Sequence, residues 1–311
     1  MLRFVLGRAV ALAGTVFLAA LAVFLLLTVI PGDAARLVVG PEATPEAYAR
    51  ARDALGLDRP WPARFADWLG RAVRGDFGRS WAYPWPVGEL LSSALSITLP
   101  LALLAIAVAS VLGLGAGLLA ASHLRRRVDL GLMALSQIGV AVPEFWVGIL
   151  LIGWVAVGWR TFPSGGFPGW GDPRALSHLV LPALALALPR GAYLARMVRA
   201  TVADVLARDH IRTARAKGLP ERRVLLHALR GALVPVTAAF GLTFARLLAG
   251  TLVVENVFAL PGLGWYAVRA ASGRDLVLLL GIAVVTAAMV GVVSTLADLG
   301  YALLNPRIRH R

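Results

Sequence analysis

Cysteine is absent from this 311-residue sequence, and lysine occurs only once, at position 217. Without cysteine the chain can have no disulfide framework, no cysteine-ligated zinc or iron–sulfur cluster and no thiol nucleophile. The histidines are also few, and no two lie close together in the sequence: His123, His178, His210, His227 and His310. A histidine metal site would need distant partners, so we expect no metal in this chain.

Two motifs that mark enzymes are missing as well. A phosphate-binding loop for ATP needs a lysine followed by serine or threonine, because the ammonium reaches the phosphates and the hydroxyl binds magnesium. Here Lys217 is followed by Gly218. We therefore expect no ATPase activity and no cofactor in this chain; if ATP powers the protein, ATP and magnesium are bound by partner subunits. The nucleophile elbow G-x-S-x-G does not occur, and an intramembrane enzyme is the alternative that would need a buried nucleophile and base.

Charged residues make up only 15% of the sequence, whereas 59% of the residues are hydrophobic; soluble domains average about 25% and roughly 45–50%. The mean hydropathy is +0.75. Six apolar stretches are long enough to cross a hydrocarbon core of ~30 Å, although Pro182 and Pro189 break the fourth: 8–30, 94–122, 130–158, 176–200, 231–254 and 276–304. The first is too long for the apolar region of a secretory signal. The sequence therefore predicts an all-α polytopic membrane protein with six transmembrane helices in a single domain, 1–311.

The charge that is present is mostly positive, with 31 Lys and Arg against 17 Asp and Glu. Nucleic-acid binding is one explanation, but in a membrane protein basic residues follow topology. Seventeen of them lie on the N-terminal side of the predicted membrane, against four in the short segments on the other side. We therefore expect both termini in the cytoplasm, an inner (plasma) membrane location and no nucleic-acid partner.

The larger extracytoplasmic loop, 31–95, lies between the first and second spans and contains eight arginines, eight acidic residues and eight aromatic residues. Such a segment can pack on the bundle or lie at the membrane interface, so we expect a small subdomain that acts as a structural lid. Apolar spacing over 45–55 predicts a helix within it. In the second span, Gly113 and Gly117 stand four residues apart, which predicts close packing against another helix.

A cytoplasmic segment, 201–230, separates the fourth and fifth spans and is too long for a minimal connector. We expect a short cytoplasmic helix over Val202–Lys217, because the stretch is polar, basic and permissive for helix, and because Gly218 and Pro220 would end it. We expect its apolar residues to face a groove on a partner protein: Val202, Val205, Leu206 and Ile211. A solvated basic loop is the alternative interpretation.

The run 209–219, DHIRTARAKGL, closely resembles the cytoplasmic coupling loop of ABC importer permeases of the dipeptide, oligopeptide and nickel class. Further motifs match the same class in order and spacing: PGD at 31–33, LGLD at 55–58 with Pro60, GDFG at 75–78 with Ser80, Pro143 with Phe145 and Trp146, Leu181 with Pro182, ENVF at 255–258 with PGLG at 261–264, and NPRIR at 305–309. The resemblance therefore covers nearly the whole chain.

This resemblance implies a permease subunit that translocates peptides by alternating access. It implies pairing with a second permease, as a heterodimer or homodimer, and with two ATPase subunits and an extracytoplasmic substrate-binding protein. The residues implied in coupling to the ATPase are Asp209, Arg212, Thr213, Ala214, Ala216, Lys217 and Gly218. The stretch from Gly218 to Pro235 looks one residue shorter than is usual in the class, which in a helix is a rotation of ~100°. Nickel or another small solute is the alternative cargo, and a stand-alone channel or secondary carrier is the alternative class.

Three ionisable residues lie deep within predicted spans: Glu144, Arg190 and Arg246. Such residues cost roughly 2.5–3.5 kcal/mol on insertion scales and usually face a bundle interior or a water-filled path. We expect them to line the translocation path; the alternatives are ion pairing between helices or to the second permease, and snorkelling of the side chains to the membrane interface. Glu144 is the only acid deep in a span, so we expect it to be the first partner of Arg246. We expect Asp298, near the end of the sixth span, to be interfacial.

The stretch 255–264 follows a complete span, and it is too apolar for a free loop but too short for another crossing. It contains Pro261 and Phe258, and Trp265 comes directly after it. We expect a re-entrant or interfacial extracytoplasmic gate element over the translocation path. Its candidate residues are Glu255, Asn256, Phe258, Pro261, Gly262 and Gly264.

Overall fold

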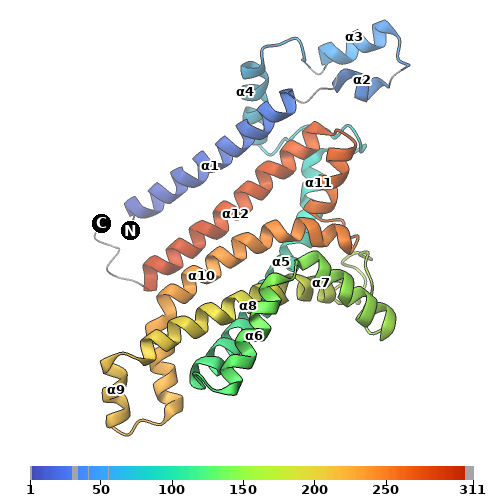
Figure 1. Ribbon diagram of the computed structural model, residues 1–311. Helices are drawn as coiled ribbons and strands as arrows, with labels where there is room; N and C mark the ends of the chain where they lie inside the picture. Colours follow the sequence, from blue (N-terminus) through green and yellow to red (C-terminus); the bar gives the residue numbers. More distant parts are fainter. Residues whose placement is uncertain (1, 30–33, 41, 55, 305–311) are drawn as a thin grey trace.

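The computed structural model describes residues 2–29, 34–40, 42–54 and 56–304, and every named element within these ranges is a helix. Figure 1 shows long helices side by side, with the start of α1 and the short helix α9 at one end of the bundle and α2–α4 and α11 at the other. The short helices are α2 (Ala34–Val39), α3 (Pro45–Ala54), α4 (Trp61–Ala72), α9 (Asp209–Ala216) and α11 (Leu263–Ser272). The motifs at 31–33 and 305–309, together with Ile30 and Leu55, lie outside the described residues.

Five helices are long and apolar enough to cross a membrane: α1 (Leu2–Val29), α5 (Val87–Ser122), α8 (Ser177–Leu206), α10 (Glu221–Val257) and α12 (Leu276–Leu304). Within the described ranges, a sixth crossing exists only if α6 (Arg127–Ala141) and the α7–η1 segment form one bent span. The all-helical architecture expected from composition is confirmed, with five to six candidate spans.

The predicted third span, 130–158, is not one straight helix. Helix α6 ends at Ala141, α7 (Glu144–Leu151) begins after Pro143 and continues as the π-helical segment η1 (Ile152–Gly158), and the two parts are bent by 99°. The ring of Pro143 disfavours the helical conformation at the residue before it, and Val142 is extended, with φ −82° and ψ 126°. A single proline therefore redirects the chain and places Glu144 in the first turn of α7.

In the predicted fourth span, by contrast, the prolines do not break the helix. Helix α8 runs through both Pro182 and Pro189, which are buried. Prolines are tolerated within a membrane helix where neighbouring elements support the freed backbone groups. Helix α8 has such neighbours, because the leucines and alanines beside these prolines pack against α5 and α10 in the central core.

Helices α5 and α8 approach closely where the sequence has small residues. A Cβ atom on Gly117 would lie 2.7 Å from the carbonyl oxygen of Ala195, and one on Gly113 would lie 2.5 Å from the Cβ of Leu194. Real Cβ atoms do not come so near, so larger residues would force the two helices apart. The packing interpretation of this glycine pair is confirmed.

The segment 31–95 contributes α2, α3, α4 and the first turns of α5, because α5 begins at Val87, earlier than the expected start at Ala94. The helix expected over 45–55 is present as α3. Helix α4 packs on the bundle through Phe65 and Trp68, which are buried beside Phe24 of α1 and Leu280 of α12. The aromatic residues of this segment therefore attach it to the outer pair of long helices.

Candidate functional site

The segment predicted to couple the chain to an ATPase is two helices, not one. Helix α8 extends to Leu206, Arg208 is extended at φ −76° and ψ 152°, and α9 begins at Asp209. The expectation of a single helix over Val202–Lys217 is wrong at this break. Its first residues belong to the long helix α8, and only 209–216 form the short helix that protrudes beyond the bundle in Figure 1.

The apolar residues of this segment are also placed differently from the expectation. Ile211 is 0% exposed and packs with Val224 and Ala228 of α10. Val202, Val205 and Leu206 lie in the same cluster. The apolar face of α9 is therefore used to hold it against α8 and α10, and the prediction that these four side chains face a partner is wrong. The outer surface of α9 consists instead of polar and small residues: Asp209, His210, Arg212, Thr213, Arg215 and Ala216.

Two further features fix α9 on the bundle. Arg215 donates from Nε and Nη2 to the two carboxylate oxygens of Glu221 on α10, at 2.8 and 3.2 Å. Gly218 has a φ of +74°, and its amide donates to the carbonyl of Arg215 at 2.9 Å. Pro220 then precedes the first turn of α10. The helix stop predicted at Gly218 and Pro220 is confirmed, and the left-handed conformation explains why glycine is needed there.

A buried ion pair that the sequence did not predict joins α6 to the same part of α8. Asp129 is 1% exposed and accepts hydrogen bonds from Nε and Nη2 of Arg199 at 3.0 and 2.7 Å, and from the amide of Arg125 at 2.9 Å. Nearby, Arg196 donates to Gln137 at 2.8 Å. Asp129 comes just before the apolar run that begins at Leu130, but nothing in the sequence indicates its partner on α8.

The three ionisable residues predicted to line the path do come together in the middle of the bundle. Glu144 of α7, Arg190 of α8 and Arg246 of α10 line one cavity of about 300 Å³, here called the charged cavity. Its other lining residues come from the same bend and the same two helices: Val140, Val142, Pro143, Pro189, Tyr193 and Thr243. The charged cavity lies where the α6–α7 bend meets the central turns of α8 and α10.

Within the charged cavity, the ion pair differs from the expected one. Glu144 pairs with Arg190 and not with Arg246. Gly250 of α10 makes room for this carboxylate, because a Cβ atom there would overlap Oε2 of Glu144. Arg246 is exposed, and within the described ranges its guanidinium makes no ion pair or hydrogen bond. The expected Glu144–Arg246 pair is therefore wrong, since the carboxylate of Glu144 already binds Arg190.

At the α11 end, the predicted gate element is a tight turn between two helices. Glu255 and Asn256 lie in the last turn of α10, Phe258 is buried directly after it, and Gly262 precedes α11. Glu255 is 0% exposed and accepts hydrogen bonds from the hydroxyl of Thr98 and the amide of Gly264, both at 2.7 Å. This carboxylate therefore ties α5, α10 and α11 together.

Small residues and amide groups complete the turn. Asn256 donates from Nδ2 to the carbonyl oxygens of Leu252 and Gly264, at 2.8 and 3.0 Å. Cβ atoms on Gly262 or Gly264 would overlap Glu255 and the backbone of Leu252, respectively. Pro261 is half-buried within the turn. The glycines of the PGLG motif are thus required by close contacts.

A second buried carboxylate at this end was missed by sequence reasoning. Asp275 accepts hydrogen bonds from the hydroxyl of Ser80 and from the amides of Trp81, Ala82 and Leu278. It holds the chain before α5 against the start of α12. Its position just before an apolar run is typical of a helix N-cap, which is the signal that the sequence offered.

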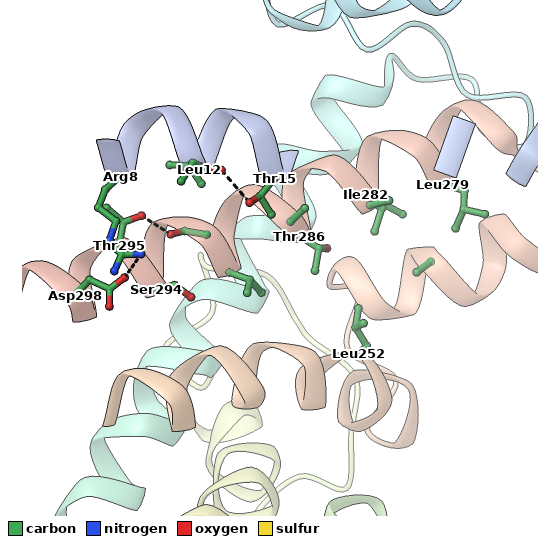
Figure 2. Close-up of a pocket in the computed structure, with 16 residues that line it drawn as sticks. Arg8, Leu12, Thr15, Leu252, Leu279, Ile282, Thr286, Ser294, Thr295 and Asp298 are labelled. Atoms are coloured by element: carbon green, nitrogen blue, oxygen red, sulfur yellow. Dashed lines mark hydrogen bonds and ion pairs between the residues drawn. The ribbon is translucent and has the colours of Figure 1, made fainter. Parts of the chain in front are cut away.

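A further cavity, of about 640 Å³, lies between α1 and α12 and contains none of the predicted path residues. Figure 2 shows Arg8 and Asp298 at one end of it and Leu279 and Ile282 toward the other. The Arg8–Asp298 ion pair is 2.9 Å long and half-exposed. Asp298, expected only to be interfacial, thus also connects the two helices.

Comparison with known proteins agrees with this architecture. Residues 113–310 match the family described as binding-protein-dependent transport system inner membrane component, and residues 1–91 match the N-terminal model of the same kind of membrane component. The chain is 39% identical over 315 residues to a protein of Brucella abortus (strain 2308) named as a peptide transport system permease, with 100% of both chains covered. It is 37% identical over 312 residues to the glutathione transport system permease of Escherichia coli (strain K12), again with 100% of both chains covered.

A solved structure shares the fold. A chain of the MetNI methionine ABC transporter, in an inward-facing conformation, superposes with a TM-score of 0.59 at 19% identity, covering 70% of this chain and 96% of that one. The full-length matches in sequence, the family models and the helical architecture agree with one another. The chain belongs to the family of binding-protein-dependent transport system inner membrane components.

Proposed function

We propose that this chain is the permease subunit of an ATP-driven importer that carries peptides across the inner membrane by alternating access. One observation carries the proposal: α9 is a short polar helix fixed between two long membrane helices, in a chain that is similar over its whole length to peptide permeases and has no phosphate-binding loop. The energy of ATP must therefore arrive through contact with other subunits.

The proposed partners are a second permease, two ATPase subunits and an extracytoplasmic substrate-binding protein. In this assembly α9 and both termini lie in the cytoplasm, and α11 with α2–α4 lies outside. The residues proposed to contact an ATPase are on or directly after α9: Asp209, Arg212, Thr213, Ala214, Ala216, Lys217 and Gly218. All of them are exposed except Ala214, which is half-buried.

The attachment of α9 suggests how its movement reaches the membrane. Ile211 packs against α10, Arg215 binds Glu221 of α10, and α8 continues directly into the break before α9. A displacement of α9 by an ATPase would therefore move the ends of α8 and α10 together. Rigid-body movement of packed helices is a common form of such transitions.

The charged cavity and the turn at 255–264 are the proposed path and outer gate. Glu144, Arg190 and Arg246 gather where α8 and α10 pass the α6–α7 bend, and ionisable groups at membrane depth usually face a water-filled path. Glu255, Asn256, Phe258, Pro261, Gly262 and Gly264 form the turn at the α11 end. Two guanidinium groups against one carboxylate would repel a nickel cation, which favours peptides as the cargo.

The test is transport by the whole complex in liposomes. The permease, copurified with its partner subunits, should take up labelled peptides only when ATP is inside and the binding protein is outside. Radioactive nickel, offered in parallel, should not accumulate. Uptake that persists without the ATPase subunits would contradict the proposal in favour of a channel or secondary carrier, and uptake of nickel instead of peptide would contradict the proposed cargo.

A further inference from the structure

The charged cavity carries more positive than negative charge. Glu144 and Arg190 neutralise each other in their ion pair. Arg246 lines the same cavity, and no carboxylate among the described residues pairs with it. A guanidinium cannot shed its proton in a protein, so it needs water or an anion at membrane depth. The cavity therefore holds one uncompensated positive charge.

Additional hydrogen-bond donors lie in the same place. Nε of Arg190 is buried and has no acceptor, although the Nη2 of the same guanidinium contacts Glu144. The Tyr193 side chain also lines the cavity, whereas the Thr243 hydroxyl already donates to the carbonyl of Ala239 at 2.7 Å. A buried donor without an acceptor is costly. An anionic ligand with oxygen acceptors would satisfy both this donor and the charge of Arg246.

We propose that the charged cavity binds the carboxylate of the transported peptide, with Arg246 as its charge partner and Arg190 Nε as a second donor. This inference rests on the proposed function, because it assigns the ligand chemistry of the proposed path. A guanidinium and a carboxylate form paired, charge-assisted hydrogen bonds. A peptide of any sequence carries a carboxylate at its C-terminus, so this contact recognises peptides as a class.

The position of the two arginines connects this site to the rest of the bundle. Arg190 lies on α8 and Arg246 on α10, the two long helices that α9 joins. Movement of α9 would therefore reach both helices that carry the groups holding the carboxylate. A site built across two moving helices can bind in one state of the transporter and release in another.

The absence of cysteine allows a direct test in the assembled complex. Val140 lines the charged cavity and is exposed, so Val140→Cys introduces the only thiol of this chain there. We expect a negatively charged methanethiosulfonate reagent to be favoured roughly fivefold over a positively charged one, each rate being taken relative to its rate with a free thiol, because one unit charge about 8 Å away in water attracts the first and repels the second. Arg246→Gln should remove this preference. Arg230→Gln, the same change near the other end of α10, should keep it, and so should Arg246→Lys.

Protection by peptides identifies the group that binds. A dipeptide with a free C-terminus should slow the labelling of Val140→Cys, whereas the same dipeptide with a C-terminal amide should not. An amidated dipeptide that contains aspartate tests whether a side-chain carboxylate can protect the thiol in place of the C-terminal carboxylate. Equal labelling by both reagents would overturn the inference and indicate that an acid of the second permease neutralises Arg246. Equal protection by free and amidated peptides would overturn it as well.

Failure of the carboxylate site can be distinguished from failure of the proposed function. ATP-driven peptide uptake by the same Val140→Cys complex is measured before labelling. If uptake is present and the free carboxylate gives no protection, only the carboxylate site is overturned. If no peptide is taken up by the unmodified complex, the proposed function itself fails.

Discussion

Arg199 on α8 holds Asp129 at the start of α6 by two hydrogen bonds, Nε to Oδ1 at 3.0 Å and Nη2 to Oδ2 at 2.7 Å. The carboxylate is buried, whereas 30% of the arginine side chain is exposed. The pair lies on the α9 side of the charged cavity and joins α8 to the α6–α7 segment that lines it. A movement of the part of α8 nearest α9 would therefore be passed to α6.

We expect Asp129→Asn to destabilise the chain by about 2–3 kcal/mol, below the roughly 3–5 kcal/mol of a fully buried pair because Arg199 remains partly hydrated. Thermal unfolding of the purified complex measures this change. Arg174→Gln is the matched control, because Arg174 is 81% exposed and its ion pair with Asp172 lies within one loop; we expect less than about 0.5 kcal/mol. Equal stability of the two variants would show that the Asp129–Arg199 pair does not hold the helices together.

We expect Gly218→Val to uncouple ATP hydrolysis from transport. A β-branched residue strongly disfavours the left-handed conformation of Gly218, at φ +74°, and the left-handed region costs roughly 1–2 kcal/mol even for ordinary residues. Because Gly218 is exposed and no atom lies within 4 Å of an added Cβ, assembly should be intact. ATPase activity and peptide uptake are measured on the same proteoliposomes.

The control for this substitution is Gly171→Val, where an added Cβ also meets no atom within 4 Å and φ is not positive. It should leave coupling unchanged. Wild-type coupling in Gly218→Val would remove the backbone conformation after α9 from the mechanism.

The proposed orientation can be read with single cysteines in this cysteine-free chain. Ala259, in the turn after α10, and Ala216, at the end of α9, are both exposed. We expect Ala259→Cys to react with an impermeant thiol reagent only from outside intact cells, and Ala216→Cys only after the membrane is opened. Ala259 is preferable to Asn256, whose amide is bound to two carbonyl groups. The opposite pattern of labelling would reverse the topology.

Glu144 and Arg246 should respond differently to neutralisation, although they line the same cavity. Glu144→Gln leaves Arg190 without its carboxylate, and we expect a loss of about 2 kcal/mol in stability and a lower yield of assembled complex. Arg246→Gln breaks no ion pair among the described residues, so stability should change by less than about 0.5 kcal/mol, while peptide uptake falls about tenfold or more. Unfolding and uptake of both variants check this; similar destabilisation by both would indicate a structural partner for Arg246.

The sequence alone determined the helical membrane architecture, because the length and apolarity of a span are local properties of the chain. The stretches 231–254 and 276–304 lie within α10 and α12, and the stop at Gly218 followed from the conformational freedom of one residue. The sequence did not determine which prolines interrupt a helix. Pro143 accompanies the sharp bend after α6, whereas Pro182 and Pro189 lie within a continuous helix.

Only the tertiary structure decided which side chains meet. Ile211 is apolar in a polar segment, which equally suits a partner protein or the chain itself, and the packing of α9 on α10 placed it inside. Glu144 had two arginines at similar depth as possible partners, and the bend at Pro143 directed it to Arg190. Asp129 and Arg199 are 70 residues apart in the chain and pair only because α6 packs on α8. Such pairings depend on which helix faces come together, and a span's composition does not encode that.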